Sequence, residues 1–332
     1  MHIGELRGIK VAITGGTGCL GSPLLRKLQS MGCFIRLLVP QQEAAPKSIS
    51  GVQIVPGDIN NEIAVARLLE GMQLVFHLAA KVHDFSGRHY SEFERVNIDG
   101  TRLLMTNAGI AGVRRVVFYS TVGVYGKDGN FNGDERSPCS PQNPYAASKY
   151  SAEKIVLSHP GVGGVEGVVL RFPVVYGQLD RGNMAKMIDA IRRHRFAVLG
   201  SGLNIRSMIN ATNAAEAAVL AGFGQNCAGK IYCVTDGVDY TLNELVEIIC
   251  KCLATSWRPQ RLPVWIAKVI GMAGDVLGMA LGRPIPFGLA TVRKLSTDLT
   301  FSCERIKNEL GYTPVQSLED GIMEEVKGIV YR

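Results

Sequence analysis

The sequence of 332 residues has eight cysteines but no Cys-x-x-Cys pair. Without such pairs, or histidines at a matching spacing, it lacks the pattern of a zinc site, and we expect no bound metal. The cysteines are scattered through apolar runs, as is typical of reduced thiols in a cytoplasmic protein. The first ten residues, MHIGELRGIK, contain no apolar signal core, so export is not expected.

The sequence also has no internal repeat and no low-complexity linker, so tethered modules are not expected. Its 36 basic and 29 acidic residues give a net charge of +7 and are scattered, apart from a short basic cluster at 192–195. Such weak patterning does not predict a nucleic-acid partner. Apolar residues make up 46% of the composition, and the chain is long enough for one large α/β unit with an added lobe, or for two domains.

One long apolar run departs from this ordinary composition. Leu262 to Leu281 is about as long as a bilayer span, but Lys268 and Asp275 interrupt it. Its apolar residues recur at helical spacing. The pattern therefore favours a helix that is buried in the core, covers a pocket or makes a peripheral membrane contact over a helix that spans the membrane.

Short β-rich runs alternate with helical patterns through the first half of the chain. Such alternation predicts right-handed βαβ crossovers and an α/β fold with a Rossmann doubly wound parallel sheet. The expected strands are Ile9–Thr14, Cys33–Val39, Val52–Val55, Leu74–Ala80, Arg115–Thr121 and Gly167–Phe172.

This alternation ends after Pro173. The expected helices beyond it are Met184–Arg195, Ala214–Phe223, Leu242–Leu253 and the apolar run, with a short strand at Lys230–Val234. We therefore expect a dinucleotide-binding domain over residues 1–172, to which the chain returns around 205–235. A smaller C-terminal α/β lobe over 173–332 should mainly bind the substrate.

A glycine-rich segment, TGGTGCLG, joins the first expected strand to the first helix. Gly15 permits a sharp turn, Gly18 lets a pyrophosphate approach the backbone, and Gly21 lets the helix pack closely. The helix start then presents free N–H groups to the phosphates. Because the glycines stand between a strand and a helix, the segment predicts a dinucleotide-binding turn.

The end of the second strand bears on the choice between NAD and NADP. An Asp or Glu there would bind the adenosine ribose, but the sequence has Val39, Pro40 and Gln41. Arg36 is close enough in sequence to meet a 2′-phosphate, so the pattern favours NADP; the alternative is a solvated strand residue. Asp58, after the third strand, could accept from the adenine amino group or cap a helix.

A tyrosine and a lysine four residues apart, Tyr145 and Lys149, stand on the same side of an expected helix that begins with Pro144. The positive lysine would lower the pKa of the tyrosine, which could then relay a proton during hydride transfer. Thr121, at the end of the fifth strand, could hold the reacting oxygen. Lys81 follows the fourth strand, where Ala79 and Ala80 leave room for a cofactor.

With these motifs the sequence resembles the extended short-chain dehydrogenase/reductase family over nearly its whole length. The matching segments include TGGTGCLG, FHLAAK, VNIDGT, STVGVYG, YAASK, LRFPVVYG and LGYTPVQSLEDGI. The resemblance implies a Rossmann domain that binds NAD(P), a catalytic Thr121 (rather than Ser120), Tyr145 and Lys149, and a homodimer. A noncatalytic NAD(P)-binding sensor or scaffold is the alternative from another functional class.

The resemblance also implies which residues line the two sites. The cofactor residues would be Gly15, Thr17, Gly18, Cys19, Leu20, Gly21, Arg36, Asp58, Ile59, Leu78, Ala79, Ala80, Lys81, Asn97, Tyr145, Lys149, Phe172, Pro173 and Val175. The substrate residues would be Lys81, Thr121, Val122, Asn183 and Arg206.

Two branches of the family remain open for the substrate. Relatives that act on nucleotide sugars commonly have an asparagine where this sequence has Val174, although Asn183 and Arg206 match phosphate-side positions. Arg36 in IRLLV, the apolar run and the ending FSCERIKNELGYTP resemble 3β-hydroxysteroid dehydrogenases and dihydroflavonol reductases. The second branch implies a bulky ring substrate whose secondary alcohol or ketone carbon exchanges a hydride. The alternative is a nucleotide-sugar 4-epimerase, dehydratase or reductase.

Overall fold

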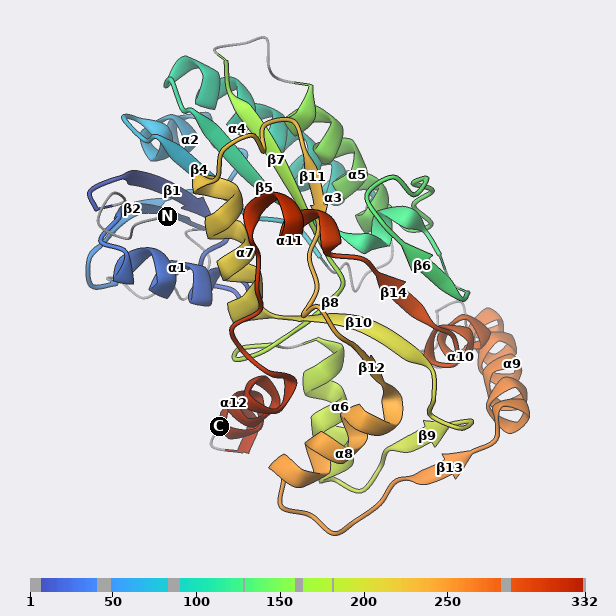
Figure 1. Cartoon of the computed structure of the whole chain (residues 1–332). Helices are drawn as coiled ribbons and strands as arrows, with labels where there is room; N and C mark the ends of the chain where they lie inside the picture. Colours follow the sequence, from blue (N-terminus) through green and yellow to red (C-terminus); the bar gives the residue numbers. More distant parts are fainter. Residues whose placement is uncertain are drawn as a thin grey trace.

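The computed structural model describes residues 7–40, 49–82, 90–127, 129–158, 164–180, 182–281 and 288–330. A seven-stranded sheet dominates the larger lobe (Figure 1), and every neighbouring pair in it is parallel. Its spatial order is β11 (Ile231–Cys233), β7 (Glu166–Phe172), β5 (Arg115–Thr121), β4 (Leu74–His77), β1 (Lys10–Thr14), β2 (Phe34–Val39) and β3 (Val52–Pro56). This order confirms the predicted Rossmann sheet, whose direction of winding reverses between β1 and β4.

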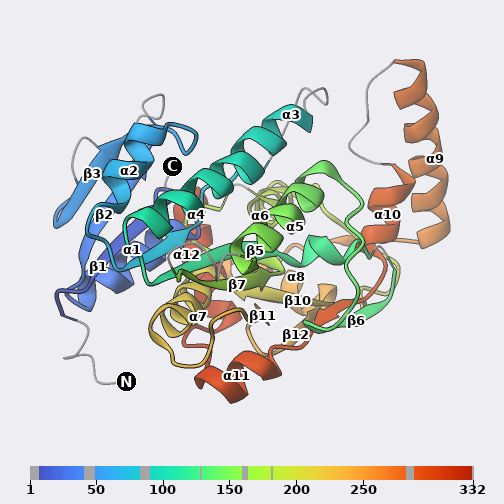
Figure 2. The ribbon, with the colours of Figure 1, turned by 90° about the horizontal axis from the view of Figure 1, so that it is seen from above.

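Helices cover both faces of this sheet (Figure 2). One face carries α1 (Gly21–Ser30) and α7 (Ala211–Phe223), and the other carries α2 (Glu62–Leu69), α4 (Gly100–Ile110) and α5 (Pro144–Leu157). In β5, Val117 and Tyr119 enter the first core and Val116 and Phe118 the second, because successive side chains of a strand point to opposite faces. Burial on both faces explains why the strands are almost continuously apolar.

The smaller lobe is built around a five-stranded sheet. It contains β12 (Asp239–Thr241), β10 (Ile205–Asn210), β14 (Leu299–Phe301), β6 (Phe131–Gly133) and β8 (Val174–Tyr176), and β9 (Ala197–Leu199) pairs separately with β13 (Gln260–Leu262). A third core lies between α6 (Asn183–Arg192), α8 (Leu242–Cys252) and α12 (Leu318–Val330). Both lobes are assembled from both halves of the chain. The smaller sheet contains β6 from the first half, and the large sheet contains β11 from the second half, with α7 and α11 (Glu304–Leu310) packed against it.

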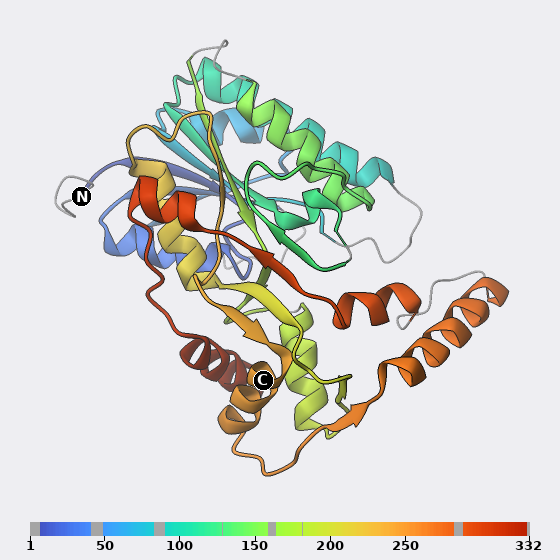
Figure 3. The ribbon, with the colours of Figure 1, turned by 45° about the vertical axis from the view of Figure 1, so that its right-hand side comes forward.

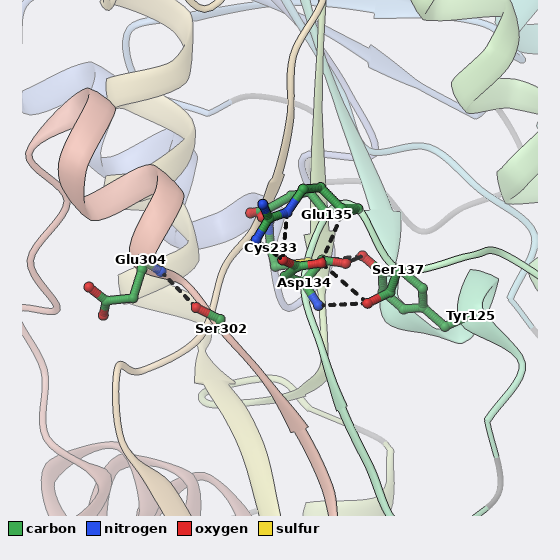
Figure 4. A network of polar contacts seen from close by, with 8 residues as sticks. Tyr125, Asp134, Glu135, Ser137, Cys233, Ser302 and Glu304 are labelled. Atoms are coloured by element: carbon green, nitrogen blue, oxygen red, sulfur yellow. Dashed lines mark hydrogen bonds and ion pairs between the residues drawn. The ribbon is translucent and has the colours of Figure 1, made fainter.

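The segment that leads from β5 into the smaller lobe is anchored by the polar network in Figure 4. A 3₁₀ turn, η3 (Val122–Tyr125), follows β5. The Tyr125 hydroxyl donates to the Asp134 carbonyl at 2.8 Å, and the Cys233 amide at the end of β11 donates to the Glu135 carboxylate at 2.7 Å. The backbone beyond the end of β5 is thereby tied to the edge strand of the large sheet.

The apolar run is not a core helix. It forms α9 (Val264–Ala280), which follows Pro263 and projects from the body with α10 (Leu289–Leu295) beside it (Figures 1 and 3). The prediction of a helix at this position is confirmed, but most of its apolar side chains are exposed because α10 covers only one of its sides. Among the described residues, no helix combines the length and the apolarity needed to cross a bilayer.

Candidate active site

The glycine turn after β1 has the shape that the sequence predicts. Gly15 has a φ of 72°, and a Cβ there would lie 2.6 Å from the Ala79 amide nitrogen. A Cβ at Gly21 would overlap the Cα of Gly16, whereas Gly18 has only the Gly15 carbonyl oxygen nearby, at 3.9 Å. The first and third glycines therefore serve backbone packing, and the second leaves the turn open. No side chain caps α1, and its first turn has no acidic residue, so its positive end suits a phosphate.

An open cleft of about 600 Å³ lies beside this turn, at the carboxyl ends of β1 to β4. Of the predicted cofactor residues, those that line it are Gly15, Thr17, Gly18, Cys19, Leu20, Gly21, Asp58, Ile59, Leu78, Ala79, Ala80, Lys81 and Val175. The cleft and the glycine turn fit a dinucleotide. When bound, such a cofactor supplies or accepts a hydride.

Arg36 does not lie in this cleft. It stands in the middle of β2, and its guanidinium donates to the carbonyl oxygens of Arg67, Leu68 and Glu70 at the end of α2. Its Nε donates to Gln53 at 2.9 Å. Arg36 therefore caps a helix, and the expectation that it meets a 2′-phosphate is wrong.

The end of β2 does contribute to the cleft, through Leu38 and Pro40. Pro40 brings no carboxylate that would repel a 2′-phosphate, and Gln41 lies outside the described residues. Asp58 lines the cleft, while its Oδ1 accepts from the backbone and the side chain of Asn60. The cap of α2 is Asn61, so Asp58 is not the cap of that helix.

Helix α5 presents the tyrosine and the lysine. It begins after Asn143, whose side chain accepts from the Ala146 amide at 2.9 Å, and Pro144 occupies its first turn. Tyr145 and Lys149 are one turn apart on the same face. Lys149 is buried, with its Nζ 3.9 Å from the centroid of the Phe118 ring, while Tyr145 is partly exposed and packs edge-on against Phe93.

The electrostatics of this pair differ from the expectation. Burial raises the pKa of Tyr145 to about 12, and burial lowers the pKa of Lys149 to about 7, against an opposing effect of Glu153. A lysine with a pKa near 7 is only partly charged at neutral pH and exerts a reduced pull on the phenol. In this structure burial, rather than Lys149, sets the pKa of Tyr145, and the effect of Lys149 on the phenol stays a prediction.

The two hydroxyls at the end of β5 have different surroundings. Thr121 Oγ1 accepts from the Gly123 amide at 3.1 Å, which leaves its own hydrogen free to donate to a substrate oxygen. Ser120 points to the other face and donates to Glu153 at 2.5 Å. The geometry therefore favours Thr121, rather than Ser120, as the residue next to the reacting oxygen.

Glu153 belongs to a buried group of charges that the sequence analysis missed. Its carboxylate pairs with the Arg171 guanidinium of β7, with Nη2 to Oε2 at 2.7 Å, and both side chains are at most 2% exposed. Arg171 also donates to the Tyr125 hydroxyl at 2.9 Å. Glu153 lies one turn beyond Lys149, so the spacing Tyr-x-x-x-Lys-x-x-x-Glu is the signal that could have found it.

Asn97 and Lys81 connect the fourth strand with α5. Asn97 is buried in a π-helical turn, η2 (Glu94–Asp99), which continues a short helix, α3 (Tyr90–Phe93), into α4. It donates to the Lys81 carbonyl at 3.0 Å and to Ser148 Oγ at 2.8 Å, and accepts from the Lys81 amide. The Lys81 side chain lines the cleft and pairs with Glu92 at 2.7 Å. Asn97 thus positions the segment after β4 rather than lining the cleft.

The other predicted site residues are dispersed. The Phe172 ring is buried 5.0 Å from Tyr119, and Val122 is buried with Val124 and Tyr125 in a small core. Their side chains therefore serve packing. Pro173 is partly buried and is not among the residues that line the cleft described above.

The two predicted phosphate-side residues belong to the smaller lobe. Asn183 is exposed at the start of α6, where Asp180, rather than Asn183, accepts the amides of Gly182 and Ala185. Arg206 is half-buried on β10, and burial lowers its pKa. These two positions come from different elements, and the structure records no contact between them.

Comparisons with known proteins identify the family of the chain. Residues 11–231 match the model of the NAD dependent epimerase/dehydratase family. The chain is 30% identical to 4-hydroxy-2-methyl-3-oxo-4-farnesyl-3,4-dihydroquinoline-1-oxide ketoreductase of Stigmatella aurantiaca, over 95% of each chain. It is 27% identical to 3beta-hydroxysteroid-dehydrogenase/decarboxylase isoform 1 of Arabidopsis thaliana, over 93% of this chain and 77% of that protein.

Among solved structures, UDP-glucuronic acid 4-epimerase from Bacillus cereus in complex with NAD has the same fold. The TM-score is 0.77 at 19% identity, over 97% of this chain and 99% of that chain. Because the family model matches most of its length, the chain is an NAD(P)-binding enzyme of the NAD-dependent epimerase/dehydratase family, within the extended short-chain dehydrogenases/reductases.

Proposed function

We propose that the enzyme transfers a hydride between NAD(P) and a secondary alcohol or ketone carbon of a bulky, largely apolar substrate. The observation that carries this proposal is that Tyr145 and Lys149 lie one turn apart on α5, while the Thr121 hydroxyl at the end of β5 accepts from the Gly123 amide and keeps its hydrogen for a substrate oxygen. Thr121 would donate a hydrogen bond to the substrate oxygen, and Tyr145 would move the proton at that oxygen.

The protonation state of Tyr145 at neutral pH suits a role as the proton donor in carbonyl reduction. With a pKa of about 12, the phenol is protonated, which is the form needed to deliver a proton to an oxygen that receives negative charge. Alcohol oxidation would instead start from the phenolate. Lys149, with its pKa of about 7, would stabilise the phenolate that remains after the proton is delivered.

The apolar substrate class is supported by two features. The relatives described above include a ketoreductase of a farnesylated quinoline oxide and a hydroxysteroid dehydrogenase, both with ring substrates by name. Val174, on β8, offers no hydrogen bond to a diphosphate, and β8 enters the smaller lobe. A nucleotide-sugar epimerase is the second candidate, favoured by Arg206 on the neighbouring strand β10.

Several finer properties remain part of this proposal. We expect NADPH to bind at least as tightly as NADH, because Pro40 brings no carboxylate to the cleft. We also expect a homodimer that pairs through a helix bundle including α5, and a cytoplasmic location compatible with eight free cysteines. A peripheral membrane contact through residues 262–281 would bring the enzyme to apolar substrates.

The decisive experiment measures turnover with NADPH or NADH on two substrate panels, UDP-sugars and hydroxysteroids or flavanonols with their ketones. The Tyr145→Phe variant should lose at least about 100-fold in kcat, the size expected of a general acid, while dinucleotide binding followed by fluorescence stays within a factor of about 2. Product from ring ketones supports the proposal. Product from UDP-sugars alone would instead favour the second candidate, a nucleotide-sugar epimerase. Undiminished turnover in Tyr145→Phe would refute the role of Tyr145.

A further inference from the structure

Five exposed apolar side chains follow one side of α9. Trp265, Val269, Met272, Val276 and Met279 recur every three or four residues, which places them on one face of the helix. Their exposed fractions lie between 47% and 75%. We call this face the outer stripe. An isolated exposed apolar residue is ordinary, but a continuous stripe of five indicates a surface that binds something.

The opposite side of α9 explains why the stripe points outward. Ala267, Gly271 and Gly278 are buried on that side, and a Cβ on Gly271 would lie 3.1 Å from the Leu289 amide nitrogen. These small residues let α10 pack closely, with Ala267 in an apolar cluster with Val292 of α10. Because α10 occupies the small-residue side, nothing described in the chain covers the outer stripe (Figure 3).

The segment that contains the stripe is predominantly basic. Segment 253–297 contains six basic residues and one acidic residue, Asp275. Asp275 Oδ2 accepts from the Leu289 amide at 3.1 Å, at the start of α10, so its charge offsets the positive end of that helix. Lys268 on α9 and Arg293 on α10 are exposed. The pair of helices α9 and α10, which we call the hairpin, therefore combines an apolar face with a net positive charge.

We propose that the outer stripe docks in the headgroup region of a bilayer that contains anionic lipids. An apolar helix face flanked by cations lies in the plane of such an interface, and Trp265 belongs to the residue types enriched there. At 17 residues, and with Lys268 and Asp275 in its sequence, α9 lies on the surface rather than crossing it. A symmetric pair of stripes from two copies would bring two segments of net positive charge together, which disfavours a second copy as the occupant.

Docking would also place the smaller lobe at the lipid surface. Arg293 of α10 approaches Gly129, in the segment that follows Thr121 and η3, at 4.0 Å from the position of an added Cβ. The hairpin is thus attached next to Gly129, two residues before β6. Membrane docking itself does not depend on the identity of the substrate, so it is tested by binding alone.

The test is cosedimentation of the full chain with vesicles of phosphatidylcholine, with or without phosphatidylglycerol. The wild-type protein should bind the anionic vesicles, and Met272→Glu with Val276→Glu should weaken binding at least 10-fold. The matched control, Val238→Glu with Val315→Glu, changes two apolar residues of 60% and 63% exposure outside the hairpin, against 61% for Val276. The control should bind like the wild type. Far-UV circular dichroism and dinucleotide binding check that all proteins are folded.

A charge-reversal variant, Lys268→Glu with Arg293→Glu, should lose most of the preference for anionic vesicles. The proposal is overturned if the wild-type protein binds neither kind of vesicle, or if the stripe variant binds as tightly as the wild type. It is also overturned if the wild type ignores vesicles but forms a dimer that only the stripe variant disrupts, because the stripe would then bind a second copy. Turnover on soluble substrates, measured separately, distinguishes these failures from a failure of the catalytic proposal.

Discussion

Replacement of Glu153 by glutamine tests the buried charges behind the active site. The carboxylate is paired with Arg171, both side chains are at most 2% exposed, and Ser120 donates to the same carboxylate. Glutamine keeps the volume but leaves the Arg171 cation without a counterion. Breaking one partner of a buried pair costs about 3–5 kcal/mol, so the free energy of unfolding should fall by that amount in urea titrations at pH 7.

A double variant separates charge from packing. In Glu153→Gln with Arg171→Met the buried cation is gone, and most of the lost stability should return. Glu319→Gln is the surface control: its pair with Lys251 is largely exposed, so the unfolding free energy should hardly change. If Glu153→Gln is as stable as the wild type, or if the double variant recovers nothing, the argument from an uncompensated buried charge is refuted.

The Glu153→Gln substitution should also change the pH dependence of turnover. Glu153 raises the pKa of Lys149 against burial, which lowers it to about 7. Removal of the negative charge should move the Lys149 pKa further down, so the fraction of charged Lys149 at pH 7 decreases. If turnover needs charged Lys149, the decline of kcat at high pH should begin at a lower pH than in the wild type. An unchanged profile in a folded Glu153→Gln variant would show that Glu153 does not act on Lys149.

Three further predictions follow from single contacts. Gly21→Ala should weaken dinucleotide binding at least about 10-fold, because its Cβ would overlap Gly16, whereas Gly328→Ala, with nothing nearby, should leave binding unchanged; equal affinities would contradict the packing argument. Burial raises the pKa of Glu325 to about 8. The stability that protonated Glu325 contributes to the folded state is therefore fully present below the pKa of this group in the unfolded chain, and it is lost as pH rises through 8. As pH rises from 5 to 9, the unfolding free energy of Glu325→Gln, measured by urea titration, should therefore rise by about 3–5 kcal/mol relative to that of the wild type. If the unfolding free energies of the two proteins change with pH in parallel, this prediction is wrong. Arg36→Ala should lower the unfolding free energy by about 1.5–3 kcal/mol without changing the ratio of the dissociation constants of NADPH and NADH; a changed ratio would restore Arg36 as a cofactor contact.

The error at Arg36 and the omission of Glu153 have a common physical origin. A sequence pattern shows that Arg36 lies on a strand, but not which helix end packs beside it. Its guanidinium binds the end of α2, about 30 residues further along the chain. Likewise, Arg171 reaches Glu153 only because β7 and α5 pack against each other. Partners of long charged side chains depend on packing between elements that are distant in sequence.

Local features, by contrast, were determined by the sequence itself. The alternation of strands and helices, the glycine turn at Gly15 to Gly21, and the one-turn spacing of Tyr145 and Lys149 follow from turn chemistry and periodicity, which operate over a few residues. Only the tertiary structure decided that burial dominates the pKa of Tyr145, that Glu153 stands behind Lys149, and that α9 exposes its apolar side. Those properties depend on which surfaces exclude water from each other, and that is a consequence of the whole chain being folded.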